Sequence, residues 1–269
     1  MVALNVYCWW LLYGIAYLEI SYLKLSDTSH IKNLSLLHSL LGFAISMLLV
    51  FRTNTAYDRW WEGRKQWGAL VNNSRNLAIK LSSILPHDDD KERSFFKEII
   101  PRFAAELRAH LQSEDTRFSL DEKPHPKIPD FDRRKHVPNQ VASLIISRTM
   151  QLNRQNKITG DQLILLNPEL TSLLDICGSC ERIKNTPIPY SYSAFIKKFI
   201  FFYILTLPLG FVFNLGYLVI PVVIFVFYVL ASLELIAEEI EEPFGNEAND
   251  LPMLRIAENI KKNVVEILT

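Results

Sequence analysis

The chain has 269 residues, of which 49% are hydrophobic and 22% are charged, and its formal net charge is zero. This combination excludes both an ordinary soluble domain and a wholly embedded helical bundle as a description of the whole chain. The zero net charge also excludes the overall basic footprint of a nucleic-acid-binding protein, so no nucleic acid is expected as a partner. The chain is therefore expected to combine membrane-spanning segments with a large aqueous part.

Four apolar segments predict membrane-spanning helices. They lie at residues 6–23, 33–51, 199–213 and 215–236. The second segment, NLSLLHSLLGFAISMLLVF, gives a helix roughly 28 Å long, close to the hydrocarbon thickness of about 30 Å. The sequence NLG at 214–216 predicts a tight turn between the last two spans.

Basic residues close to the predicted spans indicate the orientation. From Arg52 to Lys80 there are six basic and two acidic residues, and Lys197 and Lys198 precede the third span. Because basic loops are retained in the cytoplasm, the long segment between the second and third spans is predicted to be cytoplasmic, with both termini on the same side. The expected location is the inner (plasma) membrane, as a multi-pass protein.

The aqueous part has the pattern of amphipathic helices. Apolar residues recur at helical spacing over 55–85, 94–112, 140–156 and 161–183. The proline-rich, charged segment 114–139 predicts a loop, and no segment shows convincing strand alternation. The helix beginning near residue 55 follows the second span without a linker, which predicts one continuous helix.

The chain is therefore predicted to be an all-α membrane protein with four regions. These are transmembrane helices 1 and 2 at 1–51, a helical cytosolic region at 52–198, transmembrane helices 3 and 4 at 199–236, and an acidic turn with a cytosolic helix at 237–269. No enzyme is expected, because the sequence has no Gly-rich phosphate loop, no H-E-x-x-H and no G-x-S-x-G. Its six histidines are scattered along the chain.

Three motifs carry a resemblance to a known family. They are FRTNTAYDRWWEGRKQWGALVNNSRNLA (51–78), CERIKNTPIPYSY (180–192) and EEIEEPFGNEANDLPM (238–253). In their order and spacing the chain resembles the bacterial branch of the bestrophin family over essentially its whole length. The resemblance implies a homopentamer of four-span, helix-rich subunits around one central pore.

The resemblance places a narrow apolar neck on the second span. By position relative to FR, the neck residues are Phe43, Met47 and Phe51, which are spaced four apart and share one side of a helix. Five copies of each would form three stacked apolar rings, and such a constriction can close by dewetting. Without the resemblance, lipid contact or core packing would be the favoured interpretation of these side chains.

Polar residues flank the neck and are candidate pore residues: His38, Arg52, Thr53 and Asn54. His38 is predicted either to line the outer pore or to hydrogen-bond a neighbouring helix. Arg52 is predicted either to meet ions where the pore widens, together with Thr53 and Asn54, or to anchor its helix at the membrane interface.

The resemblance also implies a second constriction, at the cytosolic exit. The corresponding apolar position is Leu170, with Glu169 beside it. If Glu169 faced this aperture, five carboxylates would attract cations and oppose anions.

The acidic segment after the fourth span corresponds to the calcium clasp of the family. The matching carboxylates are Glu239, Glu242, Glu247 and Asp250. Calcium takes six to eight oxygen ligands, and these side chains could supply several of them. However, the eukaryotic pattern is a denser aspartate run after PFG, whereas this chain has NEANDLP. A structural role is therefore preferred, in which these acids pair with arginines. No cofactor is expected to be required, and calcium is the one candidate.

Two further motifs have structural interpretations. Trp60, Trp61 and Trp67 are predicted to anchor and pack their helix at the membrane interface. Cys177 and Cys180 form a lone C-x-x-C with no second pair and no nearby histidine in the sequence. They are predicted to be small packed side chains rather than zinc ligands.

The predicted function is passive conduction of anions, chloride above all, through the apolar neck and the cytosolic aperture. The positive edges of aromatic rings favour anions at Phe43 and Phe51, whereas Glu169 and the acidic segment favour the alternative, a monovalent cation-selective channel of the same fold. A non-conducting membrane scaffold is the alternative from another class. The expected partners are further copies of the chain, the lipid bilayer and permeating inorganic ions.

Overall fold

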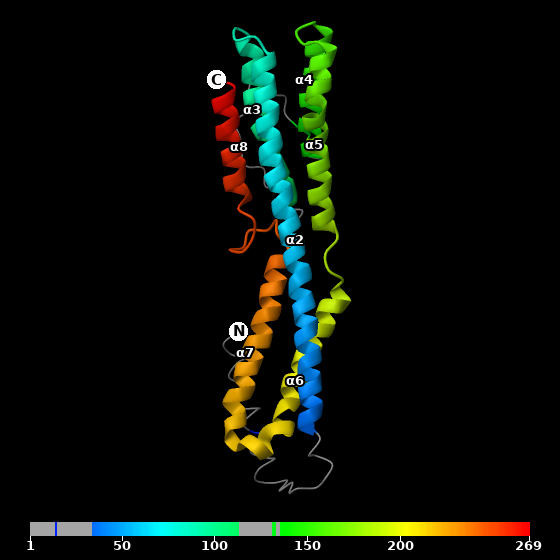
Figure 1. Ribbon diagram of the computed structural model, residues 1–269, viewed down its shortest axis with the longest axis vertical. Helices are drawn as coiled ribbons and strands as arrows, with labels where there is room; N and C mark the ends of the chain where they lie inside the picture. Colours follow the sequence, from blue (N-terminus) through cyan, green and yellow to red (C-terminus); the bar gives the residue numbers. More distant parts are fainter. Residues whose placement is uncertain (1–13, 15–33, 113–130, 133–134) are drawn as a thin grey trace. The chain divides into compact units, whose positions relative to one another are not determined.

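The computed structural model describes residues 14, 34–112, 131–132 and 135–269, and every regular element in them is a helix (Figure 1). In chain order they are α2 (Leu34–Ile84), α3 (Asp90–Gln112), α4 (Val137–Arg154), α5 (Gly160–Asn185), α6 (Tyr190–Leu215), the 3-10 helix η1 (Gly216–Leu218), α7 (Val219–Glu241) and α8 (Met253–Ile267). The all-α fold class is confirmed for these residues. The first predicted span, 6–23, lies outside them apart from residue 14.

The helix α2 has 51 residues without a break, as the linker-free junction predicts. Its apolar beginning corresponds to the predicted span 33–51, and the spans at 199–213 and 215–236 fall within α6 and α7. Each of these three helices is long and apolar enough to cross a membrane. The helix α5 also meets this criterion, although its sequence predicts a cytosolic helix.

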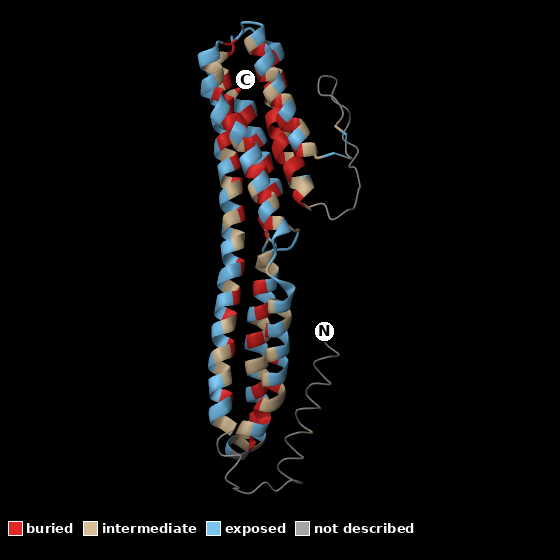
Figure 2. Ribbon diagram, turned by 90° about the vertical axis from the view of Figure 1, so that its right-hand side faces the viewer, coloured by how far each residue is buried: buried red, intermediate tan, exposed pale blue. Residues whose placement is uncertain are grey.

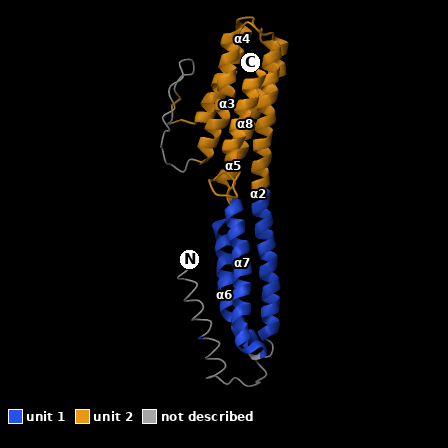
Figure 3. Cartoon of the chain, turned by 90° about the vertical axis from the view of Figure 1, so that its left-hand side faces the viewer, with its two compact units in different colours: residues 1–58, 188–241 blue, residues 59–187, 242–269 orange. Residues whose placement is uncertain are grey.

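The chain divides into two compact units, coloured separately in Figure 3. Unit 1 comprises Met1–Asp58 and Ile188–Glu241, and unit 2 comprises Arg59–Pro187 and Glu242–Thr269. The helix α2 contributes its first part to unit 1 and its second part to unit 2.

Unit 1 has an apolar core shared by α2, α6 and α7. Ile45 and Leu49 of α2 pack in one cluster with Ile200 and Ile204 of α6 and Val223 of α7. These residues recur every three or four positions, which is the spacing of one helix side. Each helix therefore buries one stripe of apolar side chains and leaves others exposed.

Two glycines shape unit 1. A Cβ atom at Gly42 would lie only 2.7 Å from the hydroxyl oxygen of Tyr203, so glycine lets α2 and α6 approach closely. Gly216 follows α6 with a φ of +55°, which glycine adopts without steric cost. The chain therefore turns at Gly216, as predicted, whereas Asn214 and Leu215 still belong to α6, and η1 completes the turn before α7 begins.

Unit 2 is a helical domain with a continuous apolar core. The helix α3 packs against α8 and α4, and α4 packs against α5. Trp67 of α2 is fully buried in this core, so it packs its helix as predicted but does not anchor it at a membrane interface. Trp60 is half-buried and donates its indole N–H to the carbonyl oxygen of Asn249 at 3.0 Å, whereas Trp61 is exposed.

Side-chain caps fix the beginnings of two helices in unit 2. The Thr159 hydroxyl accepts the amide hydrogen of Gln162, whose side chain in turn accepts the Thr159 amide hydrogen, a complete capping box for α5. His136 caps α4, because its Nδ1 accepts the amide hydrogen of Asn139 at 3.1 Å. This cap fixes the orientation of the His136 ring.

Candidate functional site

The predicted neck residues lie on an exposed stripe of α2. Within the single chain, Phe43 is 67% exposed, Met47 48% and Phe51 55%. Figure 2 shows how buried and exposed residues alternate along the helices. An apolar stripe of this kind on a membrane-length helix is expected to face lipid, another subunit or a pore, because the described part of the chain leaves about half or more of each side chain exposed.

The opposite side of α2 is buried, and His38 lies on it. Its Nε2 lies 3.1 Å from the hydroxyl oxygen of Thr206 in α6, and its Nδ1 lies 2.9 Å from the carbonyl oxygen of Leu34. A Cβ atom at Gly210 would lie 3.0 Å from the His38 ring, so α6 is close. The contacts of His38 are therefore those of the helix-bonding alternative.

Arg52 lies in a buried group of charges within unit 1. It is 1% exposed, and its Nη1 lies 2.7 Å from a carboxylate oxygen of Glu241, while its Nε lies 3.7 Å from Glu234. Glu241 also accepts the amide hydrogen of Ile188 at 2.7 Å. Arg52 thus connects α2 to the end of α7, which in turn binds the start of the returning chain before α6.

The other two flanking residues are less enclosed. Thr53 is half-buried and donates its hydroxyl hydrogen to the carbonyl oxygen of Leu49 at 2.9 Å, a bond within α2. Asn54 is exposed. Of the four predicted flanking residues, Asn54 therefore has the side chain most open to an ion.

The predicted aperture residues require a correction. Leu170 is 2% exposed and packs in the core of unit 2, so in this structure it presents no side chain to a pore. Glu169 is 8% exposed, and both of its carboxylate oxygens accept hydrogen bonds from Lys80, at 2.7 and 2.8 Å. Asn73 also donates to the Glu169 carbonyl oxygen at 2.9 Å, so this segment joins α5 to α2.

The acidic turn after α7 is held by hydrogen bonds within unit 2. Asp250 accepts the amide hydrogen of Glu247 at 2.6 Å, and the Leu251 amide donates to the carbonyl oxygen of Pro243 at 2.9 Å. Gln112 of α3 donates to the carbonyl oxygen of Gly245 at 3.1 Å. These contacts give the turn a fixed shape without an ion.

The four carboxylates of the predicted calcium clasp are divided between the units, with Glu239 in unit 1 and Glu242, Glu247 and Asp250 in unit 2. Glu242 and Glu247 are exposed, and Glu239 and Asp250 are half-buried. Among the described residues, the one group of potential metal ligands that comes together lies elsewhere.

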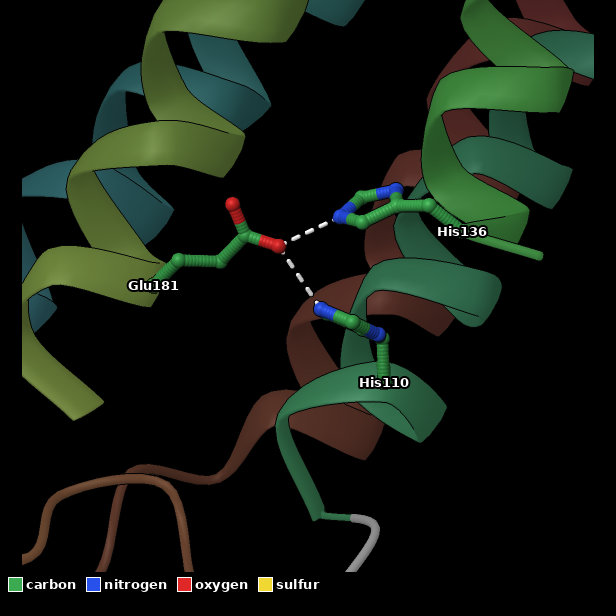
Figure 4. Close-up of side chains that lie close together, drawn as sticks. All are labelled: His110, His136 and Glu181. Atoms are coloured by element: carbon green, nitrogen blue, oxygen red, sulfur yellow. Dashed lines mark hydrogen bonds and ion pairs between the residues drawn. The ribbon is translucent and has the colours of Figure 1, made fainter. Parts of the chain in front are cut away.

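That group consists of His110, His136 and Glu181, drawn in Figure 4. The Nε2 atom of His110 lies 2.7 Å from Oε1 of Glu181, and Nε2 of His136 contacts the same oxygen. The histidines are therefore not all isolated, as their scatter in the sequence suggested. No sequence pattern pointed to this cluster, because its members come from α3, the cap of α4 and α5.

The electrostatic environment of Glu181 reflects these contacts. Although burial acts to raise its pKa, hydrogen bonds from His136 and His110 bring the pKa of Glu181 below its ordinary value. The neighbouring cysteines behave differently: both thiols are buried and free, and burial raises the pKa of Cys177 and of Cys180 to about 12. Such thiols are inert packed side chains, as their lone C-x-x-C predicts.

Comparison with known proteins identifies the family. The model of the family described as "Bacterial/Fungal Bestrophin protein" matches residues 5–266. A voltage-dependent anion channel-forming protein of Nostoc sp. is 35% identical over 234 residues, which cover 84% of this chain and 75% of the relative. A protein of the same description from Escherichia coli is 33% identical over 232 residues, covering 85% of this chain and 75% of the relative.

Solved structures give the same result. The crystal structure of a bacterial bestrophin homologue from Klebsiella pneumoniae superposes with a TM-score of 0.83 at 27% identity, covering 100% of this chain and 98% of that chain. The relatives are named as channel-forming proteins rather than enzymes, in agreement with the prediction for this chain. The chain is a membrane protein, and it belongs to the bestrophin family.

Proposed function

We propose that the chain assembles as a homopentamer that conducts anions passively, chloride above all, through a neck lined by α2. The observation that carries this proposal is the exposed apolar stripe of Phe43, Met47 and Phe51 on a helix whose other side is packed against its own chain. The names of the curated relatives, which describe them as anion channel-forming, support the anion as the permeating species.

The charges near the predicted pore support anions over cations. Glu169, which would favour cations at an aperture, is engaged by Lys80. In the acidic segment, Glu241 is paired with Arg52 and Glu238 with Lys197. Carboxylates held by cations of their own chain present less negative charge to a passing ion, which weakens the cation-selective alternative. Glu242 and Glu247 of the acidic segment are exposed and remain in its favour.

The proposed arrangement places residues 52–198 and both termini in the cytoplasm, with the protein in the inner membrane. Because α2 is continuous from the apolar stripe into unit 2, a displacement of its charged second part would move the neck. Conduction through such a pore requires no cofactor.

The test is a reversal-potential measurement on the purified protein in a planar bilayer, under an asymmetric potassium chloride gradient. An anion channel gives a reversal potential near the chloride equilibrium potential. A value near the potassium equilibrium potential would establish the cation-selective alternative, and a bilayer no more conductive than a protein-free one would leave the scaffold alternative.

A further inference from the structure

We propose that His110, His136 and Glu181 form a binding site for a divalent transition-metal ion, with zinc as its representative, that joins α3, α4 and α5. One ligand atom from each residue lies within 4.8 Å of the other two. In Figure 4 both imidazole rings point their Nε2 atoms at one carboxylate oxygen of Glu181. The three residues lie far apart in the sequence, so the tertiary fold alone brings these atoms together.

The donor set selects the class of metal. Two imidazole nitrogens and one carboxylate oxygen are three of the ligands that zinc accepts, and a water molecule can complete a tetrahedral shell. Imidazole also suits copper, nickel and iron, whereas calcium and magnesium require oxygen ligands. This site is therefore distinct in chemistry from the predicted calcium clasp.

Two of the three helix ends around the cluster favour a cation, whereas the amino end of α4 at His136 carries partial positive charge. His110 lies in the last turn of α3, and Glu181 lies close to the carboxyl end of α5, which finishes at Asn185. The carboxyl end of a helix carries partial negative charge, so it destabilises a carboxylate there and stabilises a positive ion. Arg182, the nearest base on α5, pairs with Glu62, so it is already engaged by another carboxylate.

The site is accessible to an incoming ion. The side chains of His110, His136 and Glu181 are 34%, 30% and 28% exposed. The two imidazole rings lie with their centroids 4.4 Å apart. A metal at the centre would replace the hydrogen bonds to Glu181 by bonds to the ion, which requires the ligand atoms to separate only slightly.

Metal binding is coupled to the beginning of α4. In the metal-free structure Nδ1 of His136 accepts the Asn139 amide hydrogen, so the proton of the neutral ring is on Nε2. A metal bound to Nε2 displaces this proton, and the neutral ring must then carry its proton on Nδ1, which no longer accepts from Asn139. Metal binding therefore breaks the hydrogen bond from the Asn139 amide to His136 that caps α4, and it forms a bond between His136 and the metal.

The experiment uses the full-length protein, purified in detergent and stripped with a chelator, and titrates it with Co²⁺ alone. Cobalt reports nitrogen and oxygen ligation through its visible d–d absorption, and Zn²⁺ added afterwards must displace it. Wild type is expected to bind one Co²⁺ per subunit at this site. The variants His110→Ala, His136→Asn and Glu181→Gln are each expected to weaken binding by at least about tenfold.

The variants and control keep the result interpretable. His136→Asn retains an oxygen that can cap α4, and Glu181→Gln retains the shape of the side chain, so loss of binding with an unchanged melting temperature of the metal-free protein is loss of a ligand. His87→Ala removes an exposed histidine outside the cluster and should bind as wild type does.

Two results would overturn the proposal. One is Co²⁺ binding by wild type that is no stronger than in the three variants. The other is a melting temperature of wild type that responds to pH but not to Zn²⁺, which would make the cluster a hydrogen-bonded network only. Neither result depends on whether the protein conducts ions.

Discussion

The two units differ in the exposure of their large aromatic side chains. In unit 1, Phe43, Phe201 and Phe225 are exposed on their own chain, whereas in unit 2 Phe96 and Phe103 are fully buried. Unit 2 therefore has the core of a water-soluble helical domain. The exposed aromatic surface of unit 1 carries no free-energy penalty where it faces lipid, neighbouring subunits or the proposed pore.

The units also differ in how deeply their ion pairs are buried. Unit 1 buries Arg52 between Glu234 and Glu241 among apolar helices, whereas unit 2 places Lys80 on Glu169 at a more open position. The cost of breaking an ion pair grows with its burial, so matched substitutions in the two units should differ in size.

The largest effect on stability is expected in the core of unit 2. Phe103→Ala should destabilise the protein by about 3–5 kcal/mol, because it leaves a cavity in a packed core. The matched change in unit 1, Phe43→Ala, should leave stability nearly unchanged, since that side chain is 67% exposed. Denaturation monitored by circular dichroism in detergent measures both, and equal losses would contradict the contrast between the units.

Removal of the buried guanidinium in unit 1 should be nearly as damaging. Arg52→Gln leaves two carboxylates without their cation, and breaking a buried pair in this way costs about 3 kcal/mol or more. The control is Arg64→Gln, which removes an exposed arginine of the same helix. Thermal unfolding in detergent compares the two, and an Arg52→Gln protein as stable as the control would show that the pair contributes nothing.

A smaller loss is expected from the more open pair in unit 2. Lys80→Met should cost about 1–2 kcal/mol, because it leaves the Glu169 carboxylate with fewer partners while solvent reaches the site. Adding Glu169→Gln should restore part of this loss by removing the unpaired charge.

The same two proteins, measured in a bilayer, should keep the reversal potential of wild type. A shift towards the potassium equilibrium potential in Lys80→Met would instead place Glu169 at the aperture.

The smallest effect concerns pH. The hydrogen bond from Lys157 holds the pKa of Asp89 below its usual value. A depressed carboxyl pKa means that the stabilisation is present above the unfolded-state pKa, near 3.9, and is lost as the pH falls through the folded-state pKa. Asp89→Asn should therefore cost about 0.5 kcal/mol at pH 7, and the difference from wild type should vanish in acid. A difference in stability that persists at pH 2 would show that the Asp89 carboxylate is not its cause.

The helices could be predicted from the sequence because their signals are local. The apolar length of 33–51 and the helical periodicity after residue 55 are enough to predict α2, and the absence of a linker predicts its continuity. Phe43, Met47 and Phe51 are spaced four apart in this predicted helix, and they are exposed on α2. Their role in a pore still rests on the proposal above.

The clusters could not be predicted, because they depend on which sides of distant helices meet. Arg52 is paired with Glu241, which follows it 189 residues later in the sequence, and no local pattern specifies that contact. The same holds for Lys80 with Glu169 and for the two histidines on Glu181. The same holds for Leu170. Its position in the family motif predicts an aperture residue, but the packing of α5 places its side chain in the core of unit 2.

Ion flux from liposomes tests whether the apolar stripe of α2 faces a pore. Chloride efflux would be compared for wild type, Phe43→Ala and Phe225→Ala, the last a phenylalanine of α7 that is 66% exposed, against 67% for Phe43. Phe43→Ala should give faster efflux, because a smaller side chain widens and wets the neck, and Phe225→Ala should give the efflux of wild type. Identical efflux from all three proteins, or wild-type efflux no greater than that of empty liposomes, would contradict a pore at this stripe.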